Sequence, residues 1–413
     1  MGVALDASVR PAANGLRRPW ALLGISFVLV MIDGYDLFIV SFVAPLLAKD
    51  LKLSLAEIGG VFAAGLAGSM AGGLLLGSWA DRVGRRPMVL FALGAAGLAT
   101  LLCSQAQSVG AFTALRFLAG FSLGGLLAAL VPLVAEHFPR QHRSAAVTLM
   151  FVGYPLGAVV GGAITALLLM HGWRSLFMGA GIVTLLLLTM GFCLPETLTT
   201  AAAPLEKQNR GPLMLALVEL FTDGRLWRTI AGSVAILLLL LVSYLLNSWT
   251  PLIAVNAGFS PRVSVWCGVL LNLGGVVGAL GSTLLAARFG VFKVVTCMLA
   301  CGAFAVALLG QLFGSAGTLY CGLALVGVLV IGGQQNAPAI SVQLYPQRMR
   351  SAGVGWQFAA GRCGSILGPL IGGRLLAANV PMPLLFLLIG IPVLLAAAAY
   401  MAAGRLLRSQ AAE

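Results

Sequence analysis

Two carboxylates, Asp33 and Asp36, lie inside the first long apolar run of the chain. On insertion scales a charged side chain at the centre of a bilayer costs roughly 2.5–3.5 kcal/mol, and such groups mark functional sites. The two residues are three positions apart, so they lie on one face of a helix. Burial and mutual repulsion oppose two charges in one place, and we expect at least one carboxyl to bind a proton reversibly. A pair of structural hydrogen-bond acceptors is the alternative.

Two arginines also lie within apolar runs. Arg362 is well inside the run 352–377, where a fixed guanidinium can bind a carboxylate bidentately. Arg116 shares one helical face with Gly120 and Gly124, so a cation lies at the end of a smooth packing strip. The alternatives are a structural pair between Arg362 and an aspartate, and an interfacial position for Arg116.

Polar and aromatic side chains in several other runs predict a polar cavity with aromatic walls. Each of them alone could equally be a helix–helix hydrogen bond or an interface anchor. Besides Arg362, we predict substrate contacts for Tyr154, Tyr244, Asn247, Asn272, Gln335, Asn336 and Trp356.

The composition places these residues in a polytopic membrane protein. Of the 413 residues 60% are hydrophobic and only 9% are charged, and the mean hydropathy is +1.02. A soluble domain usually has about 25% charged residues, which this chain lacks. A secreted enzyme, a nucleic-acid-binding domain and a disordered scaffold are therefore excluded. The net charge of +13 is no sign of nucleic-acid binding, because the chain has no run of five or more basic residues.

The apolar runs predict twelve transmembrane helices, since a bilayer core takes about 20 apolar residues per helix. The first run is too long for the hydrophobic region of a signal peptide, and we expect it to remain as the first span. The predicted spans are 20–48, 56–78, 87–105, 109–135, 145–170, 173–194, 227–256, 262–286, 291–313, 317–341, 352–377 and 382–404.

The basic residues predict the topology. With a cytoplasmic N-terminus, the cytoplasmic segments carry 18 Lys and Arg and the opposite loops carry 5, which places both termini in the cytoplasm. The predicted organisation is a cytoplasmic N-terminal tail, a six-helix bundle, a cytoplasmic central loop, a second six-helix bundle and a cytoplasmic tail. These parts cover residues 1–19, 20–195, 196–226, 227–404 and 405–413.

The two halves are an internal repeat. The segment 138–147 aligns with 345–354 at an offset of 207, and 80–84 aligns with 286–290 at an offset of 206. Transporters duplicated in this way bind substrate between the halves, near the middle of the bilayer, and alternate access by rocking. The repeat therefore favours a carrier, although a channel could also be duplicated.

The sharpest motif lies between the second and third predicted spans. It reads Gly77-Ser-Trp-Ala-Asp81-Arg82-Val-Gly84-Arg85-Arg86 and resembles the G-x-x-x-D-R-x-G-R-R loop of the major facilitator superfamily. The resemblance implies a cytoplasmic latch that holds the outward-open state. We include Glu136 and Arg350 in this gating group, although Glu136 has a structural role as its alternative. The second copy of the motif has Ala287 in place of the aspartate, so two unequal latches are expected.

Further motifs narrow the resemblance. Asp33-Gly-Tyr-Asp36 followed by Pro45, the loop at 77–86, and the segment 345–369 with Arg362 together resemble the aromatic acid:proton symporter family, over about residues 20–400. This implies import of benzoate-like or hydroxyphenylpropionate-like anions with protons. On that reading Asp33, Asp36 and Arg116 serve proton coupling and Arg362 holds the substrate carboxylate. Some members use a histidine in the second half, where this chain has none.

The resemblance also implies a monomer in the inner membrane of a bacterium, driven by the proton gradient without a cofactor or bound metal. Its partners would be a small aromatic carboxylate, protons and the lipid bilayer, and no nucleic acid. The same-fold alternative is proton-antiport efflux of drugs or organic anions, but the antiporter pattern G-x-x-x-G-P is missing from the fifth span. A membrane enzyme is disfavoured because the chain lacks HExxH, P-loop and Ser-elbow motifs. A channel or receptor would leave the latch motif unexplained.

Overall fold

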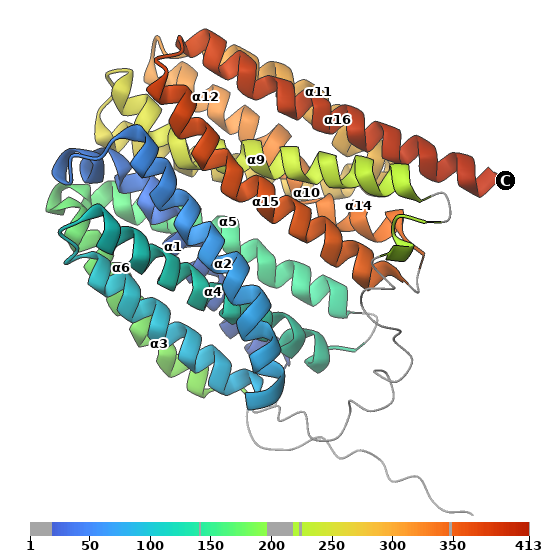
Figure 1. Cartoon of the computed structure of the whole chain (residues 1–413), viewed down its shortest axis with the longest axis horizontal. Coiled ribbons are helices and arrows are strands. Elements are labelled where there is room, and N and C mark those ends of the chain that lie inside the picture. Colours follow the sequence, from blue (N-terminus) through green and yellow to red (C-terminus); the bar gives the residue numbers. More distant parts are fainter. Residues whose placement is uncertain (1–18, 140–141, 196–217, 223–224, 347–348, 413) are drawn as a thin grey trace, which may run out of the picture.

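The computed structural model describes residues 19–139, 142–195, 218–222, 225–346 and 349–412. These residues form helices and short connections without a β-strand. Figure 1 shows the two halves of the chain side by side, with the blue-to-green helices of the first half next to the yellow-to-red helices of the second. The predicted all-helical membrane fold of two six-helix bundles is confirmed.

The first half contains six membrane-length helices, with a single 3₁₀ turn at Leu169–His171 between the last two. The helices are α1 (Pro19–Asp50), α2 (Leu55–Val83), α3 (Arg85–Cys103), α4 (Val109–His137), α5 (Arg143–Leu168) and α6 (Gly172–Phe192).

In the described part of the second half there are six matching membrane-length helices, one of which is interrupted. They are α9 (Leu226–Asn256), α10 (Pro261–Phe289), α11 (Val291–Leu309), the interrupted rod, α15 (Arg350–Ala377) and α16 (Met382–Ala412). The interrupted rod consists of α12 (Ala316–Val326), a π-helical turn at Gly327–Ile331, α13 (Gly332–Gln334) and α14 (Ala337–Leu344).

The number of spans obtained from hydropathy differs from the number of membrane-length helices. By length and composition, ten segments of the described chain are apolar enough to cross a membrane. The helices α5 and α6 are counted as one segment, Ala145–Phe192, because only the 3₁₀ turn at Leu169–His171 separates them. The helix α15 does not qualify, and it is the helix that carries Arg362 and Gln357 among many glycines. Its low hydropathy reflects a position between the halves, against α9 and α2.

The backbone repeats with the sequence. Six described residues have positive φ, and they form three pairs at an offset of 206 or 207. The pairs are Lys52 with Gly258, Gly84 with Gly290, and Gly172 with Asn379. Each pair sits at the same turn of its bundle, so the duplication predicted from the sequence extends to the connections.

Close helix contacts inside each half depend on glycine. A Cβ atom at Gly120 of α4 would lie 2.0 Å from the carbonyl oxygen of Gly65 in α2. In the second half, a Cβ at Gly327 would lie 2.1 Å from the carbonyl oxygen of Leu271 in α10. Small residues let two backbones meet at such distances, which is the usual way that helices pack in a membrane.

The two bundle ends differ in how the halves meet. We call the end with the α2–α3, α4–α5 and α10–α11 connections the basic end, and the other the opposite end. Towards the opposite end, Trp249 of α9 donates a hydrogen bond to the Pro369 carbonyl of α15 and packs edge-on against Phe62 of α2. Nearby, a Cβ at Gly373 of α15 would lie 2.9 Å from the Leu55 carbonyl oxygen of α2. The opposite end is therefore closed by direct contact between the halves.

Candidate functional site

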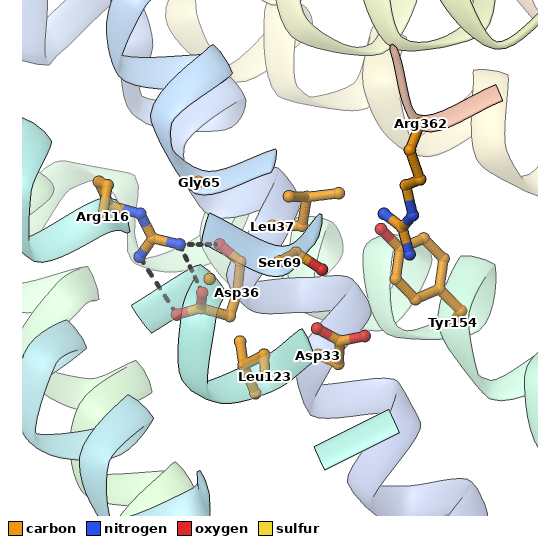
Figure 2. Close-up of a pocket in the computed structure, with 10 residues that line it drawn as sticks. Asp33, Asp36, Leu37, Gly65, Ser69, Arg116, Leu123, Tyr154 and Arg362 are labelled. Atoms are coloured by element: carbon orange, nitrogen blue, oxygen red, sulfur yellow. Dashed lines mark hydrogen bonds and ion pairs between the residues drawn. The ribbon is translucent and has the colours of Figure 1, made fainter. Parts of the chain in front are cut away.

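A cavity near the middle of the helices brings together charged side chains of both halves, of which Arg362 is half-buried and the others are buried. We call it the polar cavity. Its lining residues come from α1, α2, α4, α5 and α15, and they are Asp33, Asp36, Leu37, Gly65, Ser69, Arg116, Gly120, Leu123, Tyr154 and Arg362. Figure 2 shows Arg116 on one side of Asp36, and Arg362 beside Tyr154 on the other side of the site.

Asp36 and Arg116 form a buried ion pair. The Arg116 side chain is 2% exposed and the Asp36 side chain is 5% exposed. Arg116 Nη1 donates to Asp36 Oδ1 at 3.2 Å, while Nη2 donates to Oδ2 and to the Asp36 carbonyl oxygen. The Thr100 hydroxyl of α3 donates to Oδ1 at 2.6 Å. Both oxygens of the Asp36 carboxylate are thus engaged by fixed donors.

Asp33 has a different environment. It is buried and lines the polar cavity, yet its Oδ2 atom has no hydrogen-bond partner in the described part of the chain. Figure 2 shows its carboxylate apart from the Asp36–Arg116 pair, towards Tyr154 and Arg362. A buried carboxylate oxygen without a donor is costly when ionised. Of the two aspartates that line the cavity, Asp33 is thus the one with a carboxylate oxygen that no donor among the described residues engages.

Gly34 lies between the two aspartates and determines how α5 approaches them. A Cβ atom at Gly34 would lie 2.1 Å from the carbonyl oxygen of Tyr154. This contact places the Tyr154 ring at the wall of the polar cavity. The Tyr154 hydroxyl is 3.4 Å from the Tyr244 hydroxyl of α9, a contact that links the two halves.

A second cavity adjoins the first on the side of the opposite end. We call it the apolar cavity, because most of its lining is aliphatic or aromatic. It is lined by Leu37, Phe38, Val40, Ser41, Val61, Phe62, Gly65, Leu66, Arg116, Tyr244 and Ser248. Leu37, Gly65 and Arg116 line both cavities.

The predicted proton-coupling and substrate residues are brought together only in part. Asp33, Asp36, Arg116, Tyr154 and Arg362 line the polar cavity, and Tyr244 lines the apolar cavity. The other five predicted substrate contacts lie outside both linings, and they are Asn247, Asn272, Asn336, Trp356 and the exposed Gln335.

Hydrogen bonds to neighbouring helices account for four of these five residues. The Asn272 amide donates to Asn247 Oδ1 at 2.7 Å, and Ser41 of the first half donates to the Asn247 carbonyl at 2.5 Å. Asn336 donates to the Ser282 hydroxyl at 2.7 Å, and the Trp356 indole donates to the Ser233 hydroxyl at 3.0 Å. In this conformation these polar groups hold helices together.

The motif between α2 and α3 forms a tight connection at the basic end. Gly84 has φ of 105° and ends α2 where α3 begins. Arg85 is buried and pairs with Glu136 at the end of α4, at 2.5 Å. Gly77 packs against Ala128. Arg82 is exposed, and Arg86 is half-buried. The Asp81 side chain lies outside the described residues, and Arg350 is exposed at the start of α15.

Sequence reasoning missed several residues of the site. Thr100, which donates to Asp36, is one polar residue in an apolar helix and carries no motif. Ser69, Phe38, Phe62 and Ser248 also line the cavities, and each looks like ordinary helix content in the sequence. Among the described residues, no group of three or more His, Cys, Asp or Glu side chains is placed to hold a metal ion.

Comparison with known proteins agrees with this fold. Residues 26–339 match the family described as Major Facilitator Superfamily. The chain is 32% identical to the gallate transporter of Pseudomonas putida, over 93% of this chain and 92% of that protein. It is 31% identical to the benzoate transport protein of Acinetobacter baylyi, over 91% and 87% of the two chains.

A solved structure shows the same fold. The bacterial homologue of the human lysosomal transporter Spinster, in an inward-facing and unoccupied conformation, aligns with a TM-score of 0.75 and 16% identity, over 96% of this chain and 99% of that one. The family match covers most of the chain, and the relatives match nearly its whole length. The chain therefore belongs to the major facilitator superfamily, in the group of its aromatic-acid transporters, and it is a membrane transporter and not an enzyme.

Proposed function

We propose that this protein imports an aromatic carboxylate together with protons, across the inner membrane of a bacterium. The relatives that match over nearly the full chain are named for gallate and benzoate transport. The observation that carries the proposal is the polar cavity between the halves. Arg362 of one half lines it together with Asp33 of the other, whose Oδ2 atom has no partner among the described residues. A cation and a proton acceptor in one cavity are what cotransport of an organic anion with a proton requires.

The environment of the two aspartates supports different roles for them. Asp36 is held by Arg116 and Thr100, so the pair is a fixed charge-neutral unit. Asp33 has an oxygen without a donor and faces the cavity. We therefore assign the transported proton to the Asp33 carboxylate and a positioning role to Asp36 and Arg116. Arg362 binds the substrate carboxylate, because a guanidinium presents two parallel donors to it.

The contacts between the halves suggest the direction in which the cavity opens. If the basic end is cytoplasmic, as the Lys and Arg distribution predicts, then the closed opposite end faces outward. The described conformation is then closed to the outside, and rocking of one half against the other would open it. The gating group at the basic end would stabilise the outward-open state. It consists of Gly77, Asp81, Arg82, Gly84, Arg85, Arg86, Glu136 and Arg350.

The proposal is tested by uptake of labelled aromatic acids into cells that express the protein. We expect accumulation of one or more of benzoate, hydroxybenzoates, protocatechuate, gallate and hydroxyphenylpropionate, and we expect a protonophore to abolish it. If every acid is ignored, the substrate class is wrong. If the acids leave faster than from control cells, efflux replaces import.

A matched pair of variants tests the anion site in the same assay. Arg362→Gln should reduce uptake at least a hundredfold, because the bidentate contact to the substrate is lost. Arg374→Gln removes an exposed arginine from the same helix and should leave uptake unchanged. Membrane insertion of both is checked by immunoblot of the membrane fraction. Near-normal affinity of Arg362→Gln would remove this residue from the substrate site.

A further inference from the structure

The polar and apolar cavities together match a molecule that is charged at one end and apolar at the other. They share Leu37, Gly65 and Arg116, so they are neighbours along α1 and α2. The polar cavity holds Arg362 and Asp33, whereas the apolar cavity is walled by Phe38, Phe62 and aliphatic side chains. A carboxylate at Arg362 would therefore direct the rest of a small acid towards Phe38 and Phe62.

The aromatic side chains around the apolar cavity are arranged for contact with another ring. Phe38 stacks on Tyr244 with ring centroids 6.5 Å apart and meets Tyr154 edge-on at 5.9 Å. Phe62 stands across the cavity and is fixed edge-on against Trp249 at 5.5 Å. Offset and edge-on contacts at such distances are favourable for aromatic rings.

One hydroxyl of the apolar cavity is available to a ligand. Ser248 is 7% exposed and lines the cavity, and the hydrogen bond that the structure gives it among the described residues is the one that its backbone carbonyl accepts from Ser41. The hydroxyl of Ser41, which also lines the cavity, is already committed to the carbonyl oxygens of Asn247 and Ser248. The Tyr244 hydroxyl has only its 3.4 Å contact with Tyr154.

We propose that the apolar cavity holds the aromatic ring of the substrate, and that the Ser248 hydroxyl selects acids that carry a hydroxyl group on that ring. This inference rests on the proposed function and names the residue that sets the selectivity of its site. The substrate then lies with its carboxylate at Arg362 and its ring between Phe38 and Phe62, on the side of the closed opposite end.

The selection should be modest for a physical reason. When the ring has no hydroxyl, a serine in a helix can turn its own hydroxyl to the carbonyl four residues earlier, so no buried polar group is left unpaired. The hydroxylated acid then gains one neutral hydrogen bond, which corresponds to about a threefold to tenfold preference. A site that left its polar groups unpaired would discriminate by 10⁴ or more.

Ring binding also requires a change of conformation. In the described state each cavity has room for little more than a water molecule. The ring can enter only when the halves separate or when Phe62 and Phe38 turn aside. Occupation of the apolar cavity would therefore favour a state in which the contacts at the opposite end are loosened.

The test uses the full-length protein in proteoliposomes with an imposed proton gradient. The uptake affinities for benzoate and for 2-, 3- and 4-hydroxybenzoate are compared between the wild type and Ser248→Ala. The wild type should prefer at least one hydroxylated acid about threefold to tenfold. The variant should lose that preference and keep its affinity for benzoate within about twofold, the preference corresponding to one hydrogen bond.

Two further variants keep the test decisive. Ser248→Thr retains the hydroxyl and should retain the preference. Ser243→Ala removes another buried hydroxyl of α9, one that lies outside both cavity linings, and it should leave selectivity unchanged. Equal weakening of all four acids by Ser248→Ala, or a wild type without preference, overturns the inference while import stands. If the wild type takes up none of the acids, the proposed function itself fails, and the inference fails with it.

Discussion

The two halves share one scaffold, but the buried Asp36–Arg116 pair of the first half has apolar counterparts in the second. The residues Asp36, Thr100 and Arg116 have Val242, Val306 and Leu323 as their counterparts at offsets of 206 or 207. All three counterparts are fully buried. Asp33 likewise corresponds to the fully buried Leu239. The second half therefore shows that this bundle packs without the ion pair, so the pair is not needed to build the fold.

The difference separates two chemical tasks. The buried acids and Arg116 belong to the first half, whereas Arg362 comes from the second half, where its counterpart in the first is Pro155. Under the proposed function, the proton site and the anion site thus belong to different rigid bodies. Rocking of the halves would change the distance between the two sites, which offers a direct route to coupling.

Removal of one member of the ion pair should have the strongest effect on the first half. Arg116→Leu copies the residue of the second half but leaves Asp36 buried without its cation. Breaking a buried pair in this way costs about 3–5 kcal/mol. We expect a large loss of thermal stability in detergent, measured by fluorescence-detected size-exclusion after heating.

The double variant Asp36→Val with Arg116→Leu completes the copy and serves as the control. Replacing a buried pair by apolar residues is often neutral for stability, so this variant should recover most of what the single variant loses. It should still fail to couple transport to the proton gradient. A double variant as unstable as the single one would show that the pair is required by the fold of the first half.

The variant Asp33→Asn tests which of Asp33 and Asp36 carries the transported proton. The amide cannot release a proton, so concentrative uptake should vanish and the accumulation ratio should fall to about one, while exchange of labelled for unlabelled acid continues. The measurement is uptake against counterflow in proteoliposomes. An accumulation ratio that still responds to the proton gradient would exclude Asp33 as the proton site and return the role to Asp36.

The smallest expected effect concerns the basic end. The Arg85–Glu136 pair belongs to the first half alone, because Val291 stands at the position that corresponds to Arg85. The Glu136 side chain is 47% exposed, and pairs of this kind contribute roughly 0.2–1 kcal/mol. Glu136→Gln should shift thermal stability only slightly. A shift as large as that of Arg116→Leu would mean that this pair is a main support of the bundle.

Much of the architecture could be predicted from local patterns. The apolar runs predicted every membrane-length rod to within a few residues at most ends, because burial in lipid demands uninterrupted apolar helices. The repeat predicted that each turn of the first bundle has an equivalent in the second, and Gly84 and Gly290, which both have positive φ, are such a pair. Aspartate and arginine inside apolar runs were visible for the same reason, since charge in such a run is costly and rare.

The sequence patterns do not show which side chains contact one another across helices, and the tertiary structure does. Nothing local distinguishes Asp33 from Asp36, which differ because Arg116 and Thr100 reach only the second of them. Nothing local marks Ser248 as a cavity residue, or Asn247 and Asn272 as partners of each other. Hydropathy and periodicity depend on neighbours along the chain and so determine spans and faces. Which side chains meet across the halves depends on glycine contacts and helix crossings, and these exist only in the folded molecule.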